Sequence, residues 1–126
     1  MTQPTGDPDW MDTAYSLLGE SQRRYLLYLL TDNSHGNIDE LSLQIAAWEH
    51  DESISSVSED MRQQIYIGLV HNHLPRLADH GIVDYDLRSG DIVLEPGFED
   101  LEPLLEQFKR TEDVPEERLS SPPIAE

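Results

Sequence analysis

The sequence predicts a mainly α-helical domain that carries one small β-hairpin. Three observations support this fold class. Apolar residues recur at helical spacing in four successive segments, a capping residue precedes each segment, and one stretch near residue 90 alternates apolar with polar residues around a turn. The chain has 126 residues, which is room for one domain with a modest core.

The first two helices are expected close together near the N-terminus. Asp12 can cap a helix that ends at Gly19, and Ser21 can cap a second helix over residues 22–31. Because the second segment is apolar nearly all round, we expect it in the core. Residues 32–37 are rich in Asp, Asn, Ser and Gly, which predicts a turn.

Two further helices should follow, separated by a polar insertion at residues 51–58. Asp39 can cap the first, which reaches about His50, and Ser58 can cap the second, which ends at Gly81. The carboxylates after Ser58 favour a helix start because they meet the positive end of the helix dipole. Four apolar residues of the second helix, at steps of three, four and three, are expected to face the core: Ile67, Val70, Leu74 and Leu77.

A hairpin and a final helix complete the expected elements. Residues 82–86 and 91–95 alternate apolar with polar side chains around the turn Arg88-Ser89-Gly90. Three helices followed by a helix and a hairpin is the order of a winged helix-turn-helix domain. The predicted organisation is a disordered acidic N-terminal tail, the winged-helix domain, a C-terminal amphipathic helix and a disordered tail, at residues 1–11, 12–95, 96–110 and 111–126.

Composition excludes several classes of function. The chain has no Cys, so disulfides, thiolate metal sites and Cys nucleophiles are excluded. His71 and His73 lie about 200° apart on a helix and cannot grip one metal ion together. We find no catalytic motif, no apolar run of about 20 residues and no signal sequence. We therefore expect a cytoplasmic protein that is not an enzyme and uses no cofactor, metal or membrane.

The charge is extreme, with 26 Asp plus Glu against 8 Lys plus Arg and a formal net charge of −18. One explanation is a halophilic protein, whose acidic surface stays soluble in molar salt because the salt screens self-repulsion. The other is a nucleic-acid mimic or an acidic interaction module that occupies a basic partner. The acidic residues are spread over all segments, which favours the halophilic explanation.

The longest acid-free stretch, residues 61–78, falls on the helix that would read DNA in this fold. A reading surface needs cations for phosphates and polar groups for base edges, while carboxylates repel the DNA backbone. The alternative is that a helix packed on two sides has no room for acidic residues. The expected DNA contacts are Arg62, Gln63, Gln64, Tyr66, Asn72, His73 and Arg76, with Arg88 in the hairpin.

Two apolar surfaces are expected to meet another chain. A second apolar line on the reading helix lies almost opposite the first and consists of Met61, Ile65 and Leu69. The alternative for this line is that it packs under the polar insertion at residues 51–58. The C-terminal helix presents a further apolar face, formed by Leu101, Leu104, Leu105 and Phe108. We expect homodimerisation through the C-terminal segment, with the N-terminal helix as the alternative.

Two stretches, residues 21–30 and 73–86, resemble the small haloarchaeal winged-helix proteins of unknown function. The second stretch begins His-Leu-Pro-Arg-Leu and is more distantly similar to the arsenic-repressor class of regulators. The resemblance covers roughly residues 12–95 and implies a haloarchaeal source and a winged-helix fold. Pro75 departs from that class, in which this helix is continuous, and should kink or restart the helix.

The leading hypothesis from the sequence is a transcriptional regulator that binds double-stranded DNA as a homodimer. The competing hypothesis is a winged-helix interaction module that docks on another regulator through its apolar residues and does not bind DNA.

Overall fold

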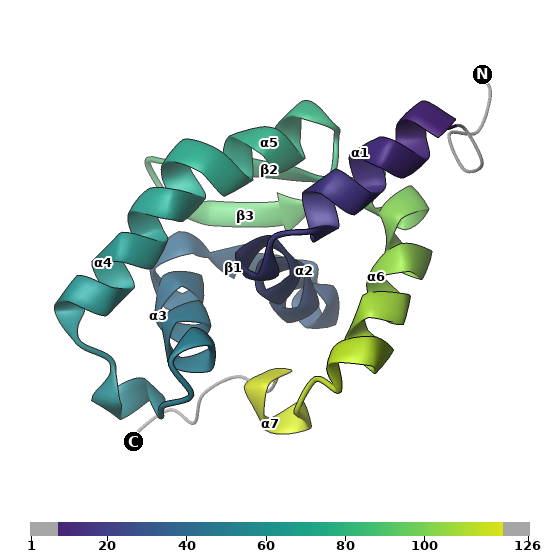
Figure 1. Cartoon of the computed structure of the whole chain (residues 1–126). Helices are drawn as coiled ribbons and strands as arrows, with labels where there is room; N and C mark the ends of the chain where they lie inside the picture. The colour runs from purple at the N-terminus through teal and green to yellow at the C-terminus, as the bar shows by residue number, and fades with distance from the viewer. Residues whose placement is uncertain (1–7, 120–126) are drawn as a thin grey trace.

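The structure is a computed structural model that describes residues 8–119. Its helices are α1 (Pro8–Leu18), α2 (Ser21–Asn33), α3 (Ile38–Glu49), α4 (Glu59–Gly68), α5 (Leu74–Asp79), α6 (Phe98–Glu112) and α7 (Glu116–Leu119). Its strands are β1 (His35–Asn37), β2 (Val83–Asp86) and β3 (Asp91–Leu94). This mainly helical, winged-helix-like arrangement confirms the predicted fold class (Figure 1).

The three strands form one antiparallel sheet in the order β1-β3-β2. The predicted hairpin is present, with Val83 opposite Leu94 and Asp86 opposite Asp91. β1 pairs with the other edge of β3, so that His35 lies opposite Val93. The sequence predicted only a turn at β1. Its three residues are too few to show an alternation of apolar and polar side chains, and their partner strand lies more than fifty residues later in the chain.

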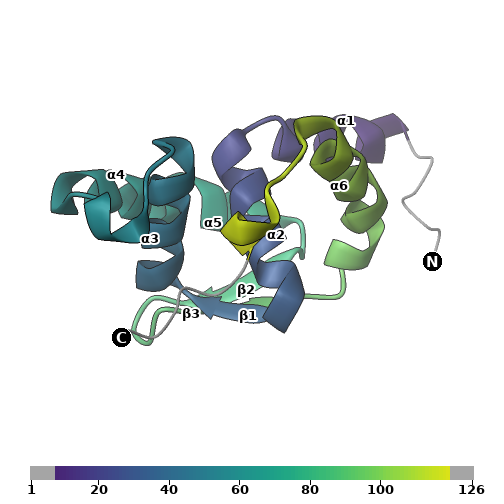
Figure 2. The ribbon, with the colours of Figure 1, turned by 90° about the horizontal axis from the view of Figure 1, so that it is seen from below.

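Helix α2 lies at the centre of the domain, as its apolar sequence predicted. Five consecutive side chains of α2, residues 26–30, are buried. In Figure 2, α3 and α4 lie at one end of the molecule and α1 and α6 at the other, with α2 between them. At about 1.5–3 kcal/mol for each fully buried large apolar side chain, this helix contributes much of the hydrophobic stabilisation.

The predicted reading helix is one continuous helix in space, but its hydrogen bonding changes from α-helical to π-helical and back. α4 passes into a π-turn at Leu69–His73, and α5 then begins at Leu74 with Pro75 in its first turn. The Leu74 N–H donates to the carbonyl of Leu69, five residues back, which is the bonding of a wide π-turn. The predicted restart at Pro75 is therefore present, and the π-turn accommodates the missing N–H of the proline.

The π-turn corrects the expected core stripe. An extra residue in one turn rotates α4 by about 100° relative to α5, compared with a uniform α-helix. Ile67 is consequently 50% exposed instead of buried. Ile65 and Leu69, expected at an interface with another chain, are buried in the domain core, and Met61 packs against that core half-buried.

The C-terminal helix also packs on its own domain. Leu101 and Leu105 are fully buried, and Leu104 and Phe108 are half-buried against the core. These four residues were expected to face a second chain, which is wrong for the two buried leucines. The reason is that α6 covers α1, whose exposed side contributes Tyr15 in an edge-on contact with Phe108 at 6.4 Å between ring centroids.

Structure extends further toward both termini than expected. α1 starts at Pro8 instead of near Asp12, with Trp10 half-buried against the core. At the other end, α7 lies in the expected tail, where Arg118 donates to the carbonyl of Glu52 at 2.8 Å. Residues 1–7 and 120–126 of the expected tails lie outside the described residues. Every helix within residues 8–119 is too short or too polar to cross a membrane.

Candidate nucleic-acid interface

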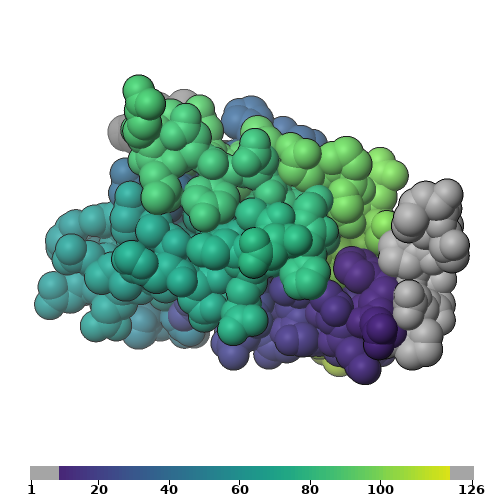
Figure 3. Space-filling model, turned by 90° about the horizontal axis from the view of Figure 1, so that it is seen from above, coloured from purple at the N-terminus to yellow at the C-terminus, as the bar shows by residue number. Residues whose placement is uncertain are grey.

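The exposed side of α4, the π-turn and α5 forms a continuous surface along one side of the molecule. Figure 3 shows this surface in teal, with the green β2–β3 hairpin rising beside one end of it. The opposite side of α4 packs against α3, which leaves this side exposed. We call it the outer face, and its exposed residues are Gln63, Gln64, Ile67, His71, Asn72 and Arg76.

Local chemistry sets where the outer face begins. The Ser58 hydroxyl accepts a hydrogen bond from the Met61 N–H at 3.1 Å, which confirms the predicted N-cap of α4. Asp60 in the first turn and Asp79 at the end of α5 bound the outer face. No acidic residue lies between them in a chain whose net charge is −18. A polyanion could therefore approach the middle of this helix without meeting a carboxylate of that helix.

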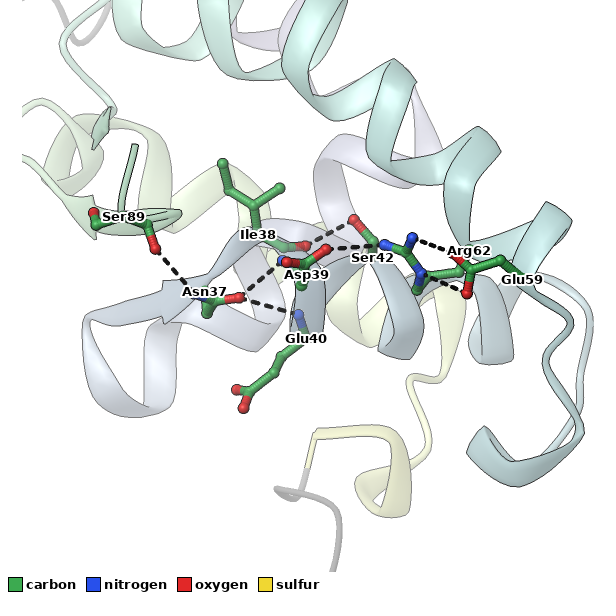
Figure 4. A network of polar contacts seen from close by, with 8 residues as sticks. All are labelled: Asn37, Ile38, Asp39, Glu40, Ser42, Glu59, Arg62 and Ser89. Atoms are coloured by element: carbon green, nitrogen blue, oxygen red, sulfur yellow. Dashed lines mark hydrogen bonds and ion pairs between the residues drawn. The ribbon is translucent and has the colours of Figure 1, made fainter. Parts of the chain in front are cut away.

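Arg62 is oriented toward α3 by two carboxylates. Its Nη1 lies 2.9 Å from an Asp39 carboxylate oxygen, and its other nitrogens donate to Glu59 (Figure 4). The hydrogen bonds that Arg62 donates to Glu59 raise the pKa of Arg62, and the guanidinium lowers the pKa of Glu59. Asp39 lies at the start of α3, where Asn37 caps the helix instead of the predicted Asp39. The structure thus places Arg62 beside the outer face with its charge neutralised.

Arg76 is the cation on the outer face. Its Nε donates to the Asn72 side-chain oxygen at 2.9 Å, one helical turn away. In the part of the chain that the structure describes, its two terminal nitrogens have no hydrogen-bond partner. Arg76 can therefore contact a phosphate through those nitrogens while its Nε fixes the orientation of Asn72.

His73 is not a surface residue, which corrects its predicted role in DNA contact. It is only 5% exposed and lies between α4 and α2. Its Nδ1 accepts from Arg23 Nη1 at 3.1 Å, because a guanidinium offers only donors. Nε2 therefore carries the proton and donates to the Gln22 side-chain oxygen at 3.1 Å. Gln22 in turn donates to Glu49 on α3.

This buried network joins the end of the π-turn to α2 and to the end of α1. Arg23 also donates to the carbonyl oxygens of Leu17 and Ser16 at the end of α1, at 2.7 and 3.1 Å. Burial and the neighbouring Arg23 lower the pKa of His73, so the network holds a neutral imidazole. His73 thus anchors the π-turn to α2 from the side opposite the outer face.

The hairpin carries a mixed charge. Arg88 is exposed at the turn, where its own N–H bonds an Asp86 carboxylate oxygen at 2.9 Å. Exposed Asp84 and Asp91 lie on the same hairpin. One cation against three carboxylates makes this wing a weak phosphate contact on its own. The turn also carries an apolar residue, Leu87, which is 52% exposed.

The remaining predicted contacts are accessible to different degrees. Gln63 and Gln64 are exposed, whereas Tyr66 is half-buried with the Arg62 guanidinium 5.9 Å from its ring centroid. Sequence reasoning missed Ile67, because a uniform helical period assigned it to the core.

Within residues 8–119, no group of three His, Asp or Glu side chains could hold a metal ion.

Comparison with known proteins identifies the family. Residues 15–93, more than half of the chain, match the family described as a domain of unknown function, DUF7344, and the chain belongs to this family. No curated protein and no solved structure matches it.

Proposed function

We propose that this DUF7344 domain is a transcriptional regulator that binds double-stranded DNA, with the outer face in the major groove. One observation carries the proposal. In a chain with 26 acidic residues, the exposed side of the reading helix carries only neutral side chains and one guanidinium between Asp60 and Asp79. A major groove about 12 Å wide admits one helix, and carboxylates on that helix would repel the phosphates.

The acidic composition sets the conditions for binding. The halophilic source proposed from composition and resemblance would supply molar salt, in which the screening length is about 3 Å. Such screening removes the long-range repulsion between an acidic chain and DNA. It also weakens the phosphate contribution that normally drives association. Affinity is then expected to depend on base contacts and apolar burial, which agrees with the few cations at this surface.

A homodimer is part of the proposal. We place the contact between the two copies at α1, the alternative named from the sequence, instead of at the apolar centre of α6. The buried leucines of α6 are occupied by its own domain. Met11 and Tyr15 remain exposed on α1, and Phe108 of α6 lies against Tyr15. A second copy packed on this α1–α6 surface would give a dimer that carries two reading helices.

The decisive test is a fluorescence anisotropy titration with genomic duplex fragments in molar KCl. Arg76→Glu is compared with Arg110→Glu, an exposed position on α6 outside the outer face. Both substitutions make the net charge more negative by the same amount, so a larger loss with Arg76→Glu reports a local contact. Equal losses, or no binding by the unaltered protein, would contradict the proposal.

Releasing Arg62 provides a second variant for the same titration. Asp39→Asn removes one of the two carboxylates that hold this guanidinium. We expect tighter DNA binding, because Arg62 then keeps only its contact with Glu59 and its Nη1 becomes available to a phosphate. Glu40→Asn is the control. Glu40 is the next residue and is exposed, so this variant also removes one negative charge but leaves the Arg62–Asp39 ion pair intact. An equal gain in both variants would mean that only net charge matters.

A protein-docking module remains the second candidate, favoured by the exposure of Ile67 and Leu87. Apolar side chains exposed by half suit a protein partner such as another regulator. This candidate is supported if duplex binding is absent in molar KCl and a co-purified partner is lost on Ile67→Asp and retained on Gln63→Asp.

A further inference from the structure

We infer that the outer face reads A·T base pairs through the major groove. This inference rests on the proposed function and names the class of duplex that the surface would select. It follows from which side chains the π-turn leaves exposed, and from which cations are already held by neighbouring residues.

The polar groups on the outer face are mainly amides. A Gln or Asn side chain can donate to adenine N7 and accept from adenine N6 at once, whereas guanine is read best by Arg or Lys at O6 and N7. Gln63, Gln64 and Asn72 are exposed along the centre of this face. Arg62, which precedes these amides on α4, is held by Asp39 and Glu59. The surface therefore carries adenine-reading amides along its length, and the one free guanidinium among its described residues, Arg76, lies at the end of this row, one turn beyond Asn72.

Ile67 adds the matching apolar contact. It lies one helical turn from Gln63 and one from His71 on the same side of the helix, and it is 50% exposed. The 5-methyl group of thymine is the apolar feature of the major groove. An isoleucine one turn from the Gln63 amide thus contacts the thymine that pairs with the adenine read by that amide. His71 can donate to N7 of either purine and does not discriminate between them.

Asn72 is oriented before any base arrives. Its side-chain oxygen accepts from Arg76 Nε at 2.9 Å, so its amide nitrogen is directed away from Arg76. A carbonyl oxygen has two lone pairs, so it can still accept from adenine N6. From Gln63 to Asn72 the helix rises about 13 Å, at about 1.5 Å per residue. That length covers about four base pairs at about 3.4 Å each.

The test begins with selection of bound sequences from a random duplex library in molar KCl, using the full chain. The expected result is enrichment of A·T pairs over about four adjacent positions in each half-site. Enrichment of G·C pairs, or no preference among bound duplexes, overturns the inference and leaves the proposed function intact. Failure to bind any duplex overturns both.

Base analogues in the selected site identify the groove and the contacts. Replacing adenine by 7-deazaadenine removes the N7 acceptor and should weaken binding about tenfold. Replacing thymine by uracil removes the methyl group and should weaken binding about fourfold. Replacing adenine by 2,6-diaminopurine adds an amino group in the minor groove only and should have little effect. A large diaminopurine effect with no 7-deazaadenine effect would mean minor-groove reading and would overturn the inference.

Variants then assign each contact to a side chain. Ile67→Ala should abolish the difference between thymine and uracil while keeping the 7-deazaadenine effect. Asn72→Ala should reduce the 7-deazaadenine effect at one position only. Both side chains are exposed, and circular dichroism of each variant checks that the fold is retained. If the thymine–uracil difference persists in Ile67→Ala, the methyl contact is wrong.

Discussion

His73 provides the sharpest test of how the reading helix is held. We predict that His73→Gln removes a pH-dependent part of the free energy of unfolding. The reason is that the His73 side chain is neutral in the folded protein, where it belongs to a buried hydrogen-bond network. The imidazole accepts from Arg23 and donates to Gln22. A proton added at Nδ1 would face the Arg23 guanidinium, so protonation opposes the folded state.

The sign follows from the lowered pKa of His73. Burial is the main cause and the Arg23 and Arg76 charges add to it, while Glu20 and Glu49 oppose it. Below the unfolded pKa of about 6.5, the unfolded chain binds the proton more readily than the folded chain. Stability from this group is therefore complete above about pH 7 and falls as the pH drops. The slope is at most about 1.4 kcal/mol per pH unit between the unfolded pKa and the lower folded pKa.

The assay is urea unfolding of the unaltered protein and two variants between pH 8 and pH 5, at constant high salt. His73→Gln should lower stability by about 1–3 kcal/mol at pH 8, because the network is disturbed, and should flatten the fall toward pH 5. His71→Gln, two residues away but exposed, is the matched control and should keep the fall. If all three proteins lose stability in parallel as the pH drops, the assignment to His73 is refuted.

Two further predictions concern how α6 is attached. Glu112 accepts from Arg24 Nε at 2.8 Å and from the Tyr28 hydroxyl at 2.6 Å, so Glu112→Gln should lower the free energy of unfolding by about 1–3 kcal/mol in urea titrations. A methyl group at Gly97 would lie 2.5 Å from the Gly81 carbonyl oxygen, so Gly97→Ala should lower the melting temperature by several degrees in calorimetry.

Each of these variants has a control within the chain. Glu99→Gln removes an exposed carboxylate in the first turn of α6 and should change stability little. Gly68→Ala adds a methyl group in ordinary contact with its nearest neighbour at 3.6 Å, within the helix, and should be neutral or stabilising. A loss with Gly68→Ala as large as that with Gly97→Ala would contradict the steric argument.

Features encoded by local patterns could be predicted from the sequence. The apolar run of α2 predicted a core helix, and Ser58 predicted the start of α4, because both signals lie within a few residues. β1 could not be predicted, because its three residues pair with a strand far along the chain. The early start of α1 escaped prediction because burial of Trp10 depends on tertiary packing.

The candidate site divides in the same way. The acid-free stretch is a property of the sequence alone and led to the outer face. The pairing of Arg62 with Asp39 could not be predicted from the sequence. The two residues are 23 positions apart, and α3 must fold beside α4 to bring them together. The burial of His73 depends on the π-turn, whose extra residue changes which side chains face inward. Positional assignments from a uniform helical period were therefore wrong for Ile67 and His73, whereas Leu74 and Leu77 are buried as predicted.

The π-turn also affects how functions can be transferred within the family. A family member that lacks one residue in this segment would form an ordinary α-helix there, with its α4 turned by about 100° against the same core. Side chains aligned with Gln63 and Ile67 would then occupy a different side of the helix. One insertion or deletion would thus change which side chains the domain exposes on this face, so surface residues of α4 should be compared only between members that share the π-turn.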